Sequence, residues 1–130
     1  MKCLVITPEK TALEMDAASI VLPLVDGEFG VMPGHTPVIA RLGAGELRVN
    51  PPQGKSIHYY VEGGFVEVLD DTVALLTMHA IPAAELDLVR AEQQYTDALS
   101  RPGHTEELAQ IKEERVHSRR ARLRVAKKHH

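Results

Sequence analysis

The sequence predicts a mainly β fold with a smaller α part: an antiparallel β-sandwich at residues 1–81, followed by an α-helical hairpin with a basic C-terminal tail at residues 82–130. Residues 1–80 hold many short β-branched runs with Gly, Pro and Asp between them about every 8–12 residues, which is typical of sandwiches and barrels. After Ile81-Pro82 the apolar residues recur at helical spacing instead.

The β part is predicted from runs that are rich in Val, Ile, Leu and Thr. The expected strands are residues 2–7, 11–15, 19–24, 38–41, 45–49, 56–61, 65–69 and 73–77. Asp70-Asp71 is the expected hairpin turn between the last two strands. The run 65–69 holds Phe65 and Leu69 besides two valines, so we expect some strands to be covered on both faces.

Residues 26–37 form a block of three glycines and two prolines between two apolar runs. Asp26-Gly27 and Pro33-Gly34 are turn signals, because Gly accepts positive φ and Pro fixes its own φ. The block is therefore expected to be a stiff, exposed loop of the kind that presents residues to a partner. Within it, His35 either bonds to the loop backbone and fixes the turn, or shapes a contact surface.

The α part is predicted as two helices joined by about five turn residues. In residues 83–99 the apolar stripe consists of Ala84, Leu88, Ala91, Tyr95, Ala98 and Leu99. Pro102-Gly103 ends this helix, and Thr105 is the expected N-cap of the next. In the second helix the stripe consists of Leu108, Ile111, Val116, Leu123 and Ala126. Both stripes are narrow, so the hairpin is expected to be the less stable part.

Charge is uneven along the chain. Eight cations and two carboxylates give residues 112–130 a charge of +6, which leaves −9 on the remainder of a chain whose net charge is −3. The basic tail suggests an acidic partner. A nucleic-acid partner is not expected, because the body is acidic and has no aromatic stacking platform. No apolar run approaches the ~18 residues of a membrane span, so membrane association is expected only through a partner.

The sequence predicts no catalytic residue, no metal site and no required cofactor. Gly54-Lys55-Ser56 ends like a phosphate-binding loop, but the first glycine of that pattern is missing and a strand follows. The seven histidines show no metal-ligand spacing, and the lone Cys3 cannot build a thiolate site. No Ser or Cys has the setting of an activated nucleophile.

Three motifs point to one family. Gly-Glu-x-Gly-x-x-Pro-Gly-His-x-Pro at residues 27–37 resembles the N-terminal signature of the epsilon subunit of bacterial and chloroplast rotary (F-type) ATP synthases. Val-Glu-Gly-Gly-Phe-Val-Glu-Val at residues 61–68 and Leu-Asp-x-x-Arg-Ala at residues 86–91 resemble its second and third signatures. The three occur in the family's order and span nearly the whole chain.

The resemblance implies a non-catalytic central-stalk subunit of the proton-translocating synthase. Its partners would be the gamma subunit, the c ring and the catalytic alpha/beta hexamer, at the cytoplasmic face of the bacterial inner membrane. Glu28, Met32 and His35 would lie on the loop that faces the c ring. The alternative is a β-sandwich adaptor whose basic helix binds an acidic protein unrelated to energy conversion.

The resemblance also implies regulation by the hairpin. Arg115, Arg119 and Arg122 would contact the hexamer and inhibit ATP hydrolysis when the hairpin extends. Asp87, Arg90 and Arg122 match family positions that bind ATP as a regulatory ligand, whereas two further family arginines are replaced by Asp97 and Ser118. The alternative for the first two residues is an intrahelical ion pair between Asp87 and Arg90, three positions apart.

Overall fold

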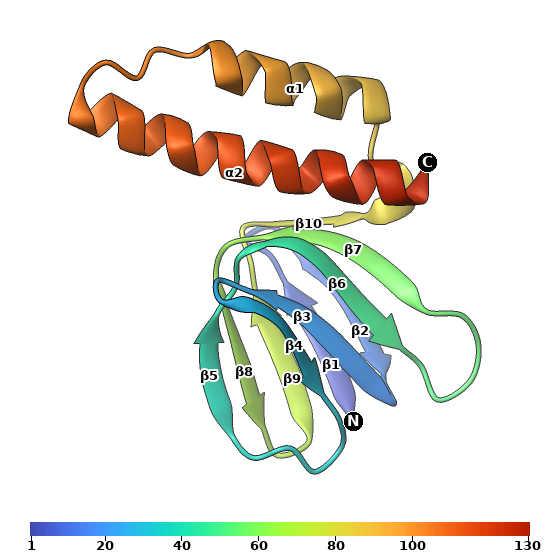
Figure 1. Ribbon diagram of the computed structural model, residues 1–130. Helices are drawn as coiled ribbons and strands as arrows, with labels where there is room; N and C mark the ends of the chain where they lie inside the picture. Colours follow the sequence, from blue (N-terminus) through green and yellow to red (C-terminus); the bar gives the residue numbers. More distant parts are fainter. The chain divides into compact units, whose positions relative to one another are not determined.

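The computed structural model describes residues 1–130 and contains ten strands, a 3₁₀ turn and two helices (Figure 1). The chain divides into two compact units, Met1–Pro82 and Ala83–His130. The first unit holds two five-stranded sheets and the second holds the two helices. The predicted fold class is confirmed.

The ten strands lie close to the expected ones, with two additions. They are β1 (Lys2–Ile6), β2 (Thr11–Asp16), β3 (Ser19–Leu24), β4 (Gly27–Val31), β5 (Val38–Arg41), β6 (Ala44–Asn50), β7 (Ile57–Glu62), β8 (Phe65–Leu69), β9 (Thr72–Leu76) and β10 (His79–Pro82). Sheet A has the order β2-β1-β9-β8-β5, and sheet B has the order β10-β7-β6-β3-β4. The predicted turn between β8 and β9 is confirmed, and Asp70 and Asp71 both have positive φ, as a type I′ turn requires.

One strand pair departs from the all-antiparallel expectation. β1 pairs with β9 in parallel, with Lys2 opposite Thr72 and Ile6 opposite Leu76. Parallel neighbours need a long connection between them, and here strands β2 to β8 supply it. The run of short β segments in the sequence indicates a β fold but does not show this crossover.

The core lies between the two sheets and is aliphatic. Sheet A contributes Cys3, Val5, Val66, Val68, Val73 and Leu75, and sheet B contributes Ile20, Leu22, Val31, Leu47, Val49 and Val61. Cys3 is fully buried, and burial raises the pKa of its thiol to about 12. In a region without water the thiolate would have no hydration to stabilise it.

The expectation that the run 65–69 is covered on both faces is wrong. Val66 and Val68 are buried, whereas Phe65 and Leu69 are exposed. The side chains of a strand alternate between its two faces, so β8 sends its valines into the core and its largest side chains outward. The apolar composition of residues 65–69 led to the expectation of a second covered face, but the outward face of β8 stays exposed in this chain.

The second unit consists of η1 (Ala83–Glu85), α1 (Leu88–Ser100) and α2 (Glu106–His129). The first helix begins at Leu88 rather than at residue 83, because Asp87 takes the N-cap position. Thr105 caps α2 as predicted, and its Oγ1 accepts from the Leu108 N–H at 3.1 Å. Neither helix combines the length and the apolar composition that crossing a lipid bilayer requires.

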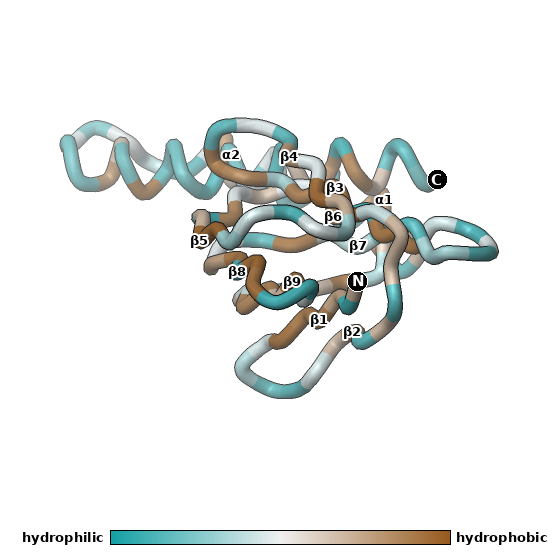
Figure 2. The backbone as a smooth tube through the Cα atoms, turned by 90° about the horizontal axis from the view of Figure 1, so that it is seen from below, coloured by the Kyte–Doolittle hydropathy of each residue, from teal (hydrophilic) through white to brown (hydrophobic).

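The helices pack against each other through small residues. Ala91 and Ala98 of α1 are buried, as are Ala121 and Ala126 of α2. The predicted stripes are wrong at Ala84, which precedes α1, and at Leu99 and Ile111 toward the loop between the helices, since all three residues are exposed. Figure 2 shows most of α2 as hydrophilic, which agrees with its narrow apolar face.

Candidate functional site

The block at residues 26–37 is not one loop. Gly27–Val31 forms strand β4, which pairs with β3 from Ile20–Val31 to Leu24–Gly27. Val25 and Asp26 make the turn, and Gly27 follows with φ of 125°. The loop proper is therefore residues 32–37, at the end of a strand that forms the edge of sheet B.

This shorter loop is held by its own backbone and by His35. The Met32 carbonyl accepts from the His35 N–H at 3.2 Å across Pro33 and Gly34, and Gly34 has φ of 83°. These are the features of a type II turn. His35 Nδ1 lies 2.7 Å from the Thr36 carbonyl oxygen, and its ring meets the ring of Phe29 edge-on at 5.4 Å. The interpretation of His35 as a residue that bonds to the loop backbone is confirmed.

The three predicted contact residues lie on this loop and on β4. Glu28 and Met32 are exposed, and His35 is half-buried. Glu28 makes no ion pair or side-chain hydrogen bond with the rest of the chain. A solvated carboxylate near the start of β4 and an exposed thioether just after its end suit recognition rather than catalysis.

Asp87 has a different role from the ion pair considered above. Its Oδ1 accepts from the Arg90 backbone N–H at 3.1 Å, which makes Asp87 the N-cap of α1. The Arg90 side chain is exposed and forms no ion pair. Asp97 accepts hydrogen bonds from Arg101 at 2.9 and 3.2 Å.

The predicted arginines of α2 are spread over the hairpin. Arg115 is exposed, Arg119 is half-buried, and Arg122 Nη1 donates to Gln94 Oε1 of α1 at 3.4 Å. The structure brings Arg122 to Gln94 of α1, one turn beyond Arg90. The predicted site residues therefore lie on one hairpin but do not form a closed cluster.

Sequence reasoning missed Arg120. Its guanidinium carbon lies 5.7 Å from the centre of the Tyr95 ring, and its Nε donates to the Tyr95 hydroxyl at 3.4 Å. This contact joins the two helices in the middle of the hairpin. Tyr95 in the apolar stripe of the first helix was the available signal, because a tyrosine there needs a polar partner for its hydroxyl.

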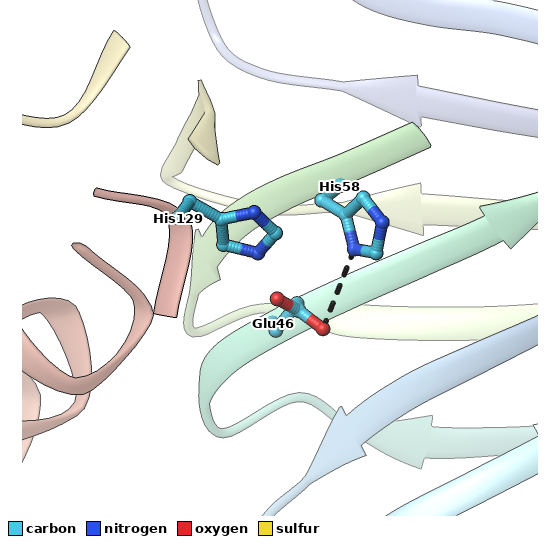
Figure 3. A group of neighbouring side chains, drawn as sticks. All are labelled: Glu46, His58 and His129. Atoms are coloured by element: carbon cyan, nitrogen blue, oxygen red, sulfur yellow. Dashed lines mark ion pairs between the residues drawn. The ribbon is translucent and has the colours of Figure 1, made fainter. Parts of the chain in front are cut away.

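Three polar pairs on sheet B were also missed. His58 Nδ1 lies 3.5 Å from Glu46 Oε1, between neighbouring strands β7 and β6 (Figure 3). The Tyr60 hydroxyl donates to Glu62 Oε1 at 2.5 Å, and His79 Nε2 lies 3.9 Å from Glu62 Oε2. The carboxylate partners of His58 and His79 depend on strand register, which spacing in the sequence does not show.

Comparisons with known proteins agree on one family. The family model "ATP synthase, Delta/Epsilon chain, beta-sandwich domain" matches residues 1–83. The chain is 43% identical over 127 residues to an ATP synthase epsilon chain of Rhodopirellula baltica, with 98% of each chain covered.

Two solved structures share the fold. One is a chain of the Euglena gracilis mitochondrial ATP synthase (OSCP/F1/c-ring, rotational state 1), with a TM-score of 0.82, 24% identity and coverage of 92% of this chain and 76% of that one. The other belongs to the Tetrahymena thermophila mitochondrial ATP synthase central stalk and c-ring, with a TM-score of 0.78, 20% identity and coverage of 97% and 96%.

Proposed function

The chain belongs to the ATP synthase delta/epsilon family, and we propose that it couples rotation of the gamma subunit to the c ring in the central stalk of a proton-translocating synthase. It is a non-catalytic subunit of a membrane-associated complex. The observation that carries the proposal is the relative that matches it over 98% of its length, which includes both the sandwich and the hairpin. The rival interpretation, an adaptor unrelated to energy conversion, has only the basic helix in its favour.

The loop after β4 is the proposed contact with the c ring. Support comes from its geometry: a Pro-Gly turn closed at 3.2 Å, a histidine packed on Phe29, and exposed Glu28 and Met32. A loop that transmits torque has to be stiff. The hydrogen bond between Met32 and His35 and the contact of His35 with Phe29 both restrict its motion. The proposed location of this subunit is the cytoplasmic face of a bacterial inner membrane, where the other subunits of the complex hold it.

A charge reversal tests the loop. Glu28→Lys should weaken assembly of this chain with the membrane sector, because it replaces the exposed carboxylate of β4 by a cation. Asp26→Lys in the preceding turn is the control, since Asp26 is also exposed and lies outside β4. Proton pumping driven by ATP in reconstituted vesicles is the measurement. Equal coupling in the two variants and the unmodified chain would count against the contact.

The hairpin is the proposed brake on ATP hydrolysis, acting on the catalytic alpha/beta hexamer. Its second helix carries Arg115, Arg119 and Arg122 on 24 residues that reach well beyond the 13 residues of α1. The packing between the helices relies on alanines and on the Arg120–Tyr95 and Arg122–Gln94 contacts, each of which is long at 3.4 Å. Such contacts are easily exchanged for contacts with a partner.

ATP is the proposed regulatory ligand of the hairpin, held weakly by Arg90 and Arg122. Both side chains lie on or against α1, and Arg101 partly neutralises Asp97, which would otherwise repel phosphates. Calorimetry of the full chain with millimolar ATP should give a weak binding signal that Arg122→Ala removes. The absence of heat with the unmodified chain would reject ATP as a ligand.

Co-purification tests the function as a whole. A tagged form of the chain should bring down the gamma subunit from detergent-solubilised membranes of its own organism. Recovery of an acidic protein without gamma would favour the adaptor instead.

A further inference from the structure

Helix α2 divides its charge between its two halves. Residues 106–114 carry four carboxylates and one lysine, whereas residues 115–128 carry seven cations and no carboxylate. The helix macrodipole favours carboxylates only in the first turn and cations only in the last turn. Glu113, Arg120 and Arg124 lie between those two turns, so the macrodipole does not account for the whole pattern.

One exposed stripe of α2 runs through both halves. Its members recur at alternating intervals of four and three residues, which places them along one side of a helix. We name this set the α2 stripe, and its seven exposed members are Glu106, Gln110, Glu113, His117, Arg120, Arg124 and Lys127. None of Glu106, Glu113, Arg124 and Lys127 forms an ion pair within the chain.

The α2 stripe borders a hollow in the hairpin. α1 and α2 run antiparallel (Figure 1), and a hollow of about 1060 Å³ lies toward the loop that connects them. Its lining includes the four middle members of the stripe and the apolar side chains of Leu99, Ala109 and Val116. Leu99 is 46% exposed. A helix laid along the stripe would therefore cover apolar surface near its middle and meet charged side chains on either side.

The charges of the stripe are arranged to fit a second copy of the stripe. Glu113 and Arg120 are equally distant from its midpoint, between Val116 and His117, and so are Glu106 and Lys127. Two identical helices that meet in antiparallel orientation at this midpoint bring Glu113 beside the partner's Arg120, and Glu106 beside the partner's Lys127. A twofold axis makes each of these contacts twice.

A partner of another kind matches only part of the stripe. An acidic protein or an acidic lipid surface would attract Arg124 and Lys127 but would repel Glu106 and Glu113. Antiparallel pairing matches both halves, and it also sets the macrodipoles of the two helices in opposite directions. Exposed ion pairs are individually weak and are screened by salt, so the association should be modest and should depend on salt.

We propose that free copies of this chain associate in antiparallel pairs through the α2 stripe, with the apolar lining of the hollow at the centre of the interface. This goes beyond the proposed function, which gives no role to Glu106, Glu113 or Lys127. It concerns the chain before assembly, and the proposed function does not depend on it.

The test is sedimentation equilibrium of the full chain from micromolar to millimolar concentration, at low and at high salt. The unmodified chain should form dimers that weaken as salt rises. Glu106→Lys with Glu113→Lys makes all the charges of the stripe basic, and Arg124→Glu with Lys127→Glu makes both of its ends acidic. Each double variant alone should associate at least about tenfold more weakly, because like charges then face each other.

Mixing the two double variants separates charge pairing from damage to the helix. The basic stripe of one variant then faces the acidic ends of the other, so equal amounts should form mixed dimers. Glu85→Lys with Glu92→Lys is the matched control for the basic variant, because it makes the same change of net charge at exposed carboxylates outside α2. It should associate as the unmodified chain does. Circular dichroism checks that all variants keep their helices.

Each outcome supports or overturns the proposal. An unmodified chain that stays monomeric at every concentration overturns it, and so do dimers that neither double variant weakens. Double variants that weaken association but do not recover on mixing overturn the antiparallel pairing. A monomeric chain that sediments with phosphatidylglycerol vesicles would assign the basic half to a lipid surface instead of a second copy. None of these outcomes changes the binding to gamma by which the proposed function is judged.

Discussion

Gly64 is the residue at which an added side chain would do most harm to the sandwich. Its φ is 96°, and a Cβ built there would lie 1.9 Å from the Leu76 carbonyl oxygen. The neighbouring Gly63 also has positive φ, of 70°, but a Cβ there meets nothing within 4 Å. The two glycines that connect β7 to β8 therefore serve different needs, conformation alone at Gly63 and close backbone approach at Gly64.

Alanine at each position separates the two needs. Gly63→Ala should cost about 1 kcal/mol of unfolding free energy, which is the usual cost of left-handed backbone for an L-residue. Gly64→Ala should cost on the order of 3 kcal/mol, because the β9 backbone also has to move. Urea denaturation of the two variants checks this, and equal losses would contradict the separation.

Cys3 gives a prediction that depends on pH. Burial raises the pKa of its thiol from 9.0 to about 12 in the folded chain. The stability that depends on the neutral thiol is therefore complete below about pH 9 and is lost as pH rises toward 12, since the unfolded chain gives up the proton first.

Alkylation is the direct measurement of this burial. At pH 8.5 iodoacetamide should modify Cys3 slowly in the native chain and rapidly in urea, because the thiolate is the reactive form. Cys3→Ser, which has no thiol to ionise, should lack the extra loss of stability above pH 9. An equally steep loss in that variant would assign the alkaline effect to other groups.

At the scale of elements, the sequence predicted the bounds of the strands better than it predicted which strands pair with each other. Strands β3, β5 and β8 have the expected bounds, because each is a β-branched or apolar run between clear turn residues. β4 was missed because Gly27 and Gly30 suggested a loop, and only its pairing with β3 makes it a strand. The parallel neighbour of β1 lies seventy residues along the chain, beyond the reach of local patterns.

The helices show the same limit. The change of period after Pro82 predicts a helix from residue 83, yet the cap at Asp87 decides its first residue. The loop ends of both apolar stripes are exposed, because Leu99 and Ile111 lie where the pair of helices ends rather than where it packs. The candidate contact residues were found through the family motifs, whereas the Glu46–His58 pair depends on the register between β6 and β7.

The cap at Asp87 can be tested by itself. Asp87→Ala should destabilise the start of α1 by about 1 kcal/mol, and Asp87→Asn should cost much less, since asparagine caps equally well. Asp97→Ala removes only an exposed pair with Arg101 and should cost a few tenths of a kcal/mol. Hydrogen exchange of the first-turn amides of α1 is the measurement. If these amides exchange as fast in the Asn variant as in the Ala variant, the capping role of Asp87 is contradicted.

At the scale of the whole molecule, the two units differ in how they are held together. The sandwich encloses fourteen buried residues in one core, from Cys3 to Leu75. The helical unit buries fewer and mostly smaller residues, five alanines with Leu86, Leu123 and Val125, and adds a few long polar contacts between its helices. Because burial of apolar area is the main source of stability, the sandwich should remain folded under conditions that release the hairpin.

This difference predicts what a shortened chain does. A chain ending at Pro82 keeps all of β10, including the pair of Pro82 with Tyr59, and loses only the helical unit. Assembled into the synthase, it should support ATP synthesis at close to the normal rate, since the sandwich alone is proposed to bind gamma and the c ring. ATP hydrolysis should rise, because the arginines of α2 are gone.

The full chain with Arg115→Ala, Arg119→Ala and Arg122→Ala combined separates the charge of the brake from its bulk. If the cations contact the hexamer, this variant should hydrolyse ATP at nearly the rate of the shortened chain while it keeps both helices. Arg124→Ala, an exposed arginine outside the proposed set, is its control and should leave hydrolysis low. Hydrolysis by inverted membrane vesicles measures all three. A shortened chain that hydrolyses ATP no faster than the full chain would remove the brake from the proposed function, and the coupling role of the sandwich would still have to be judged by its binding to gamma.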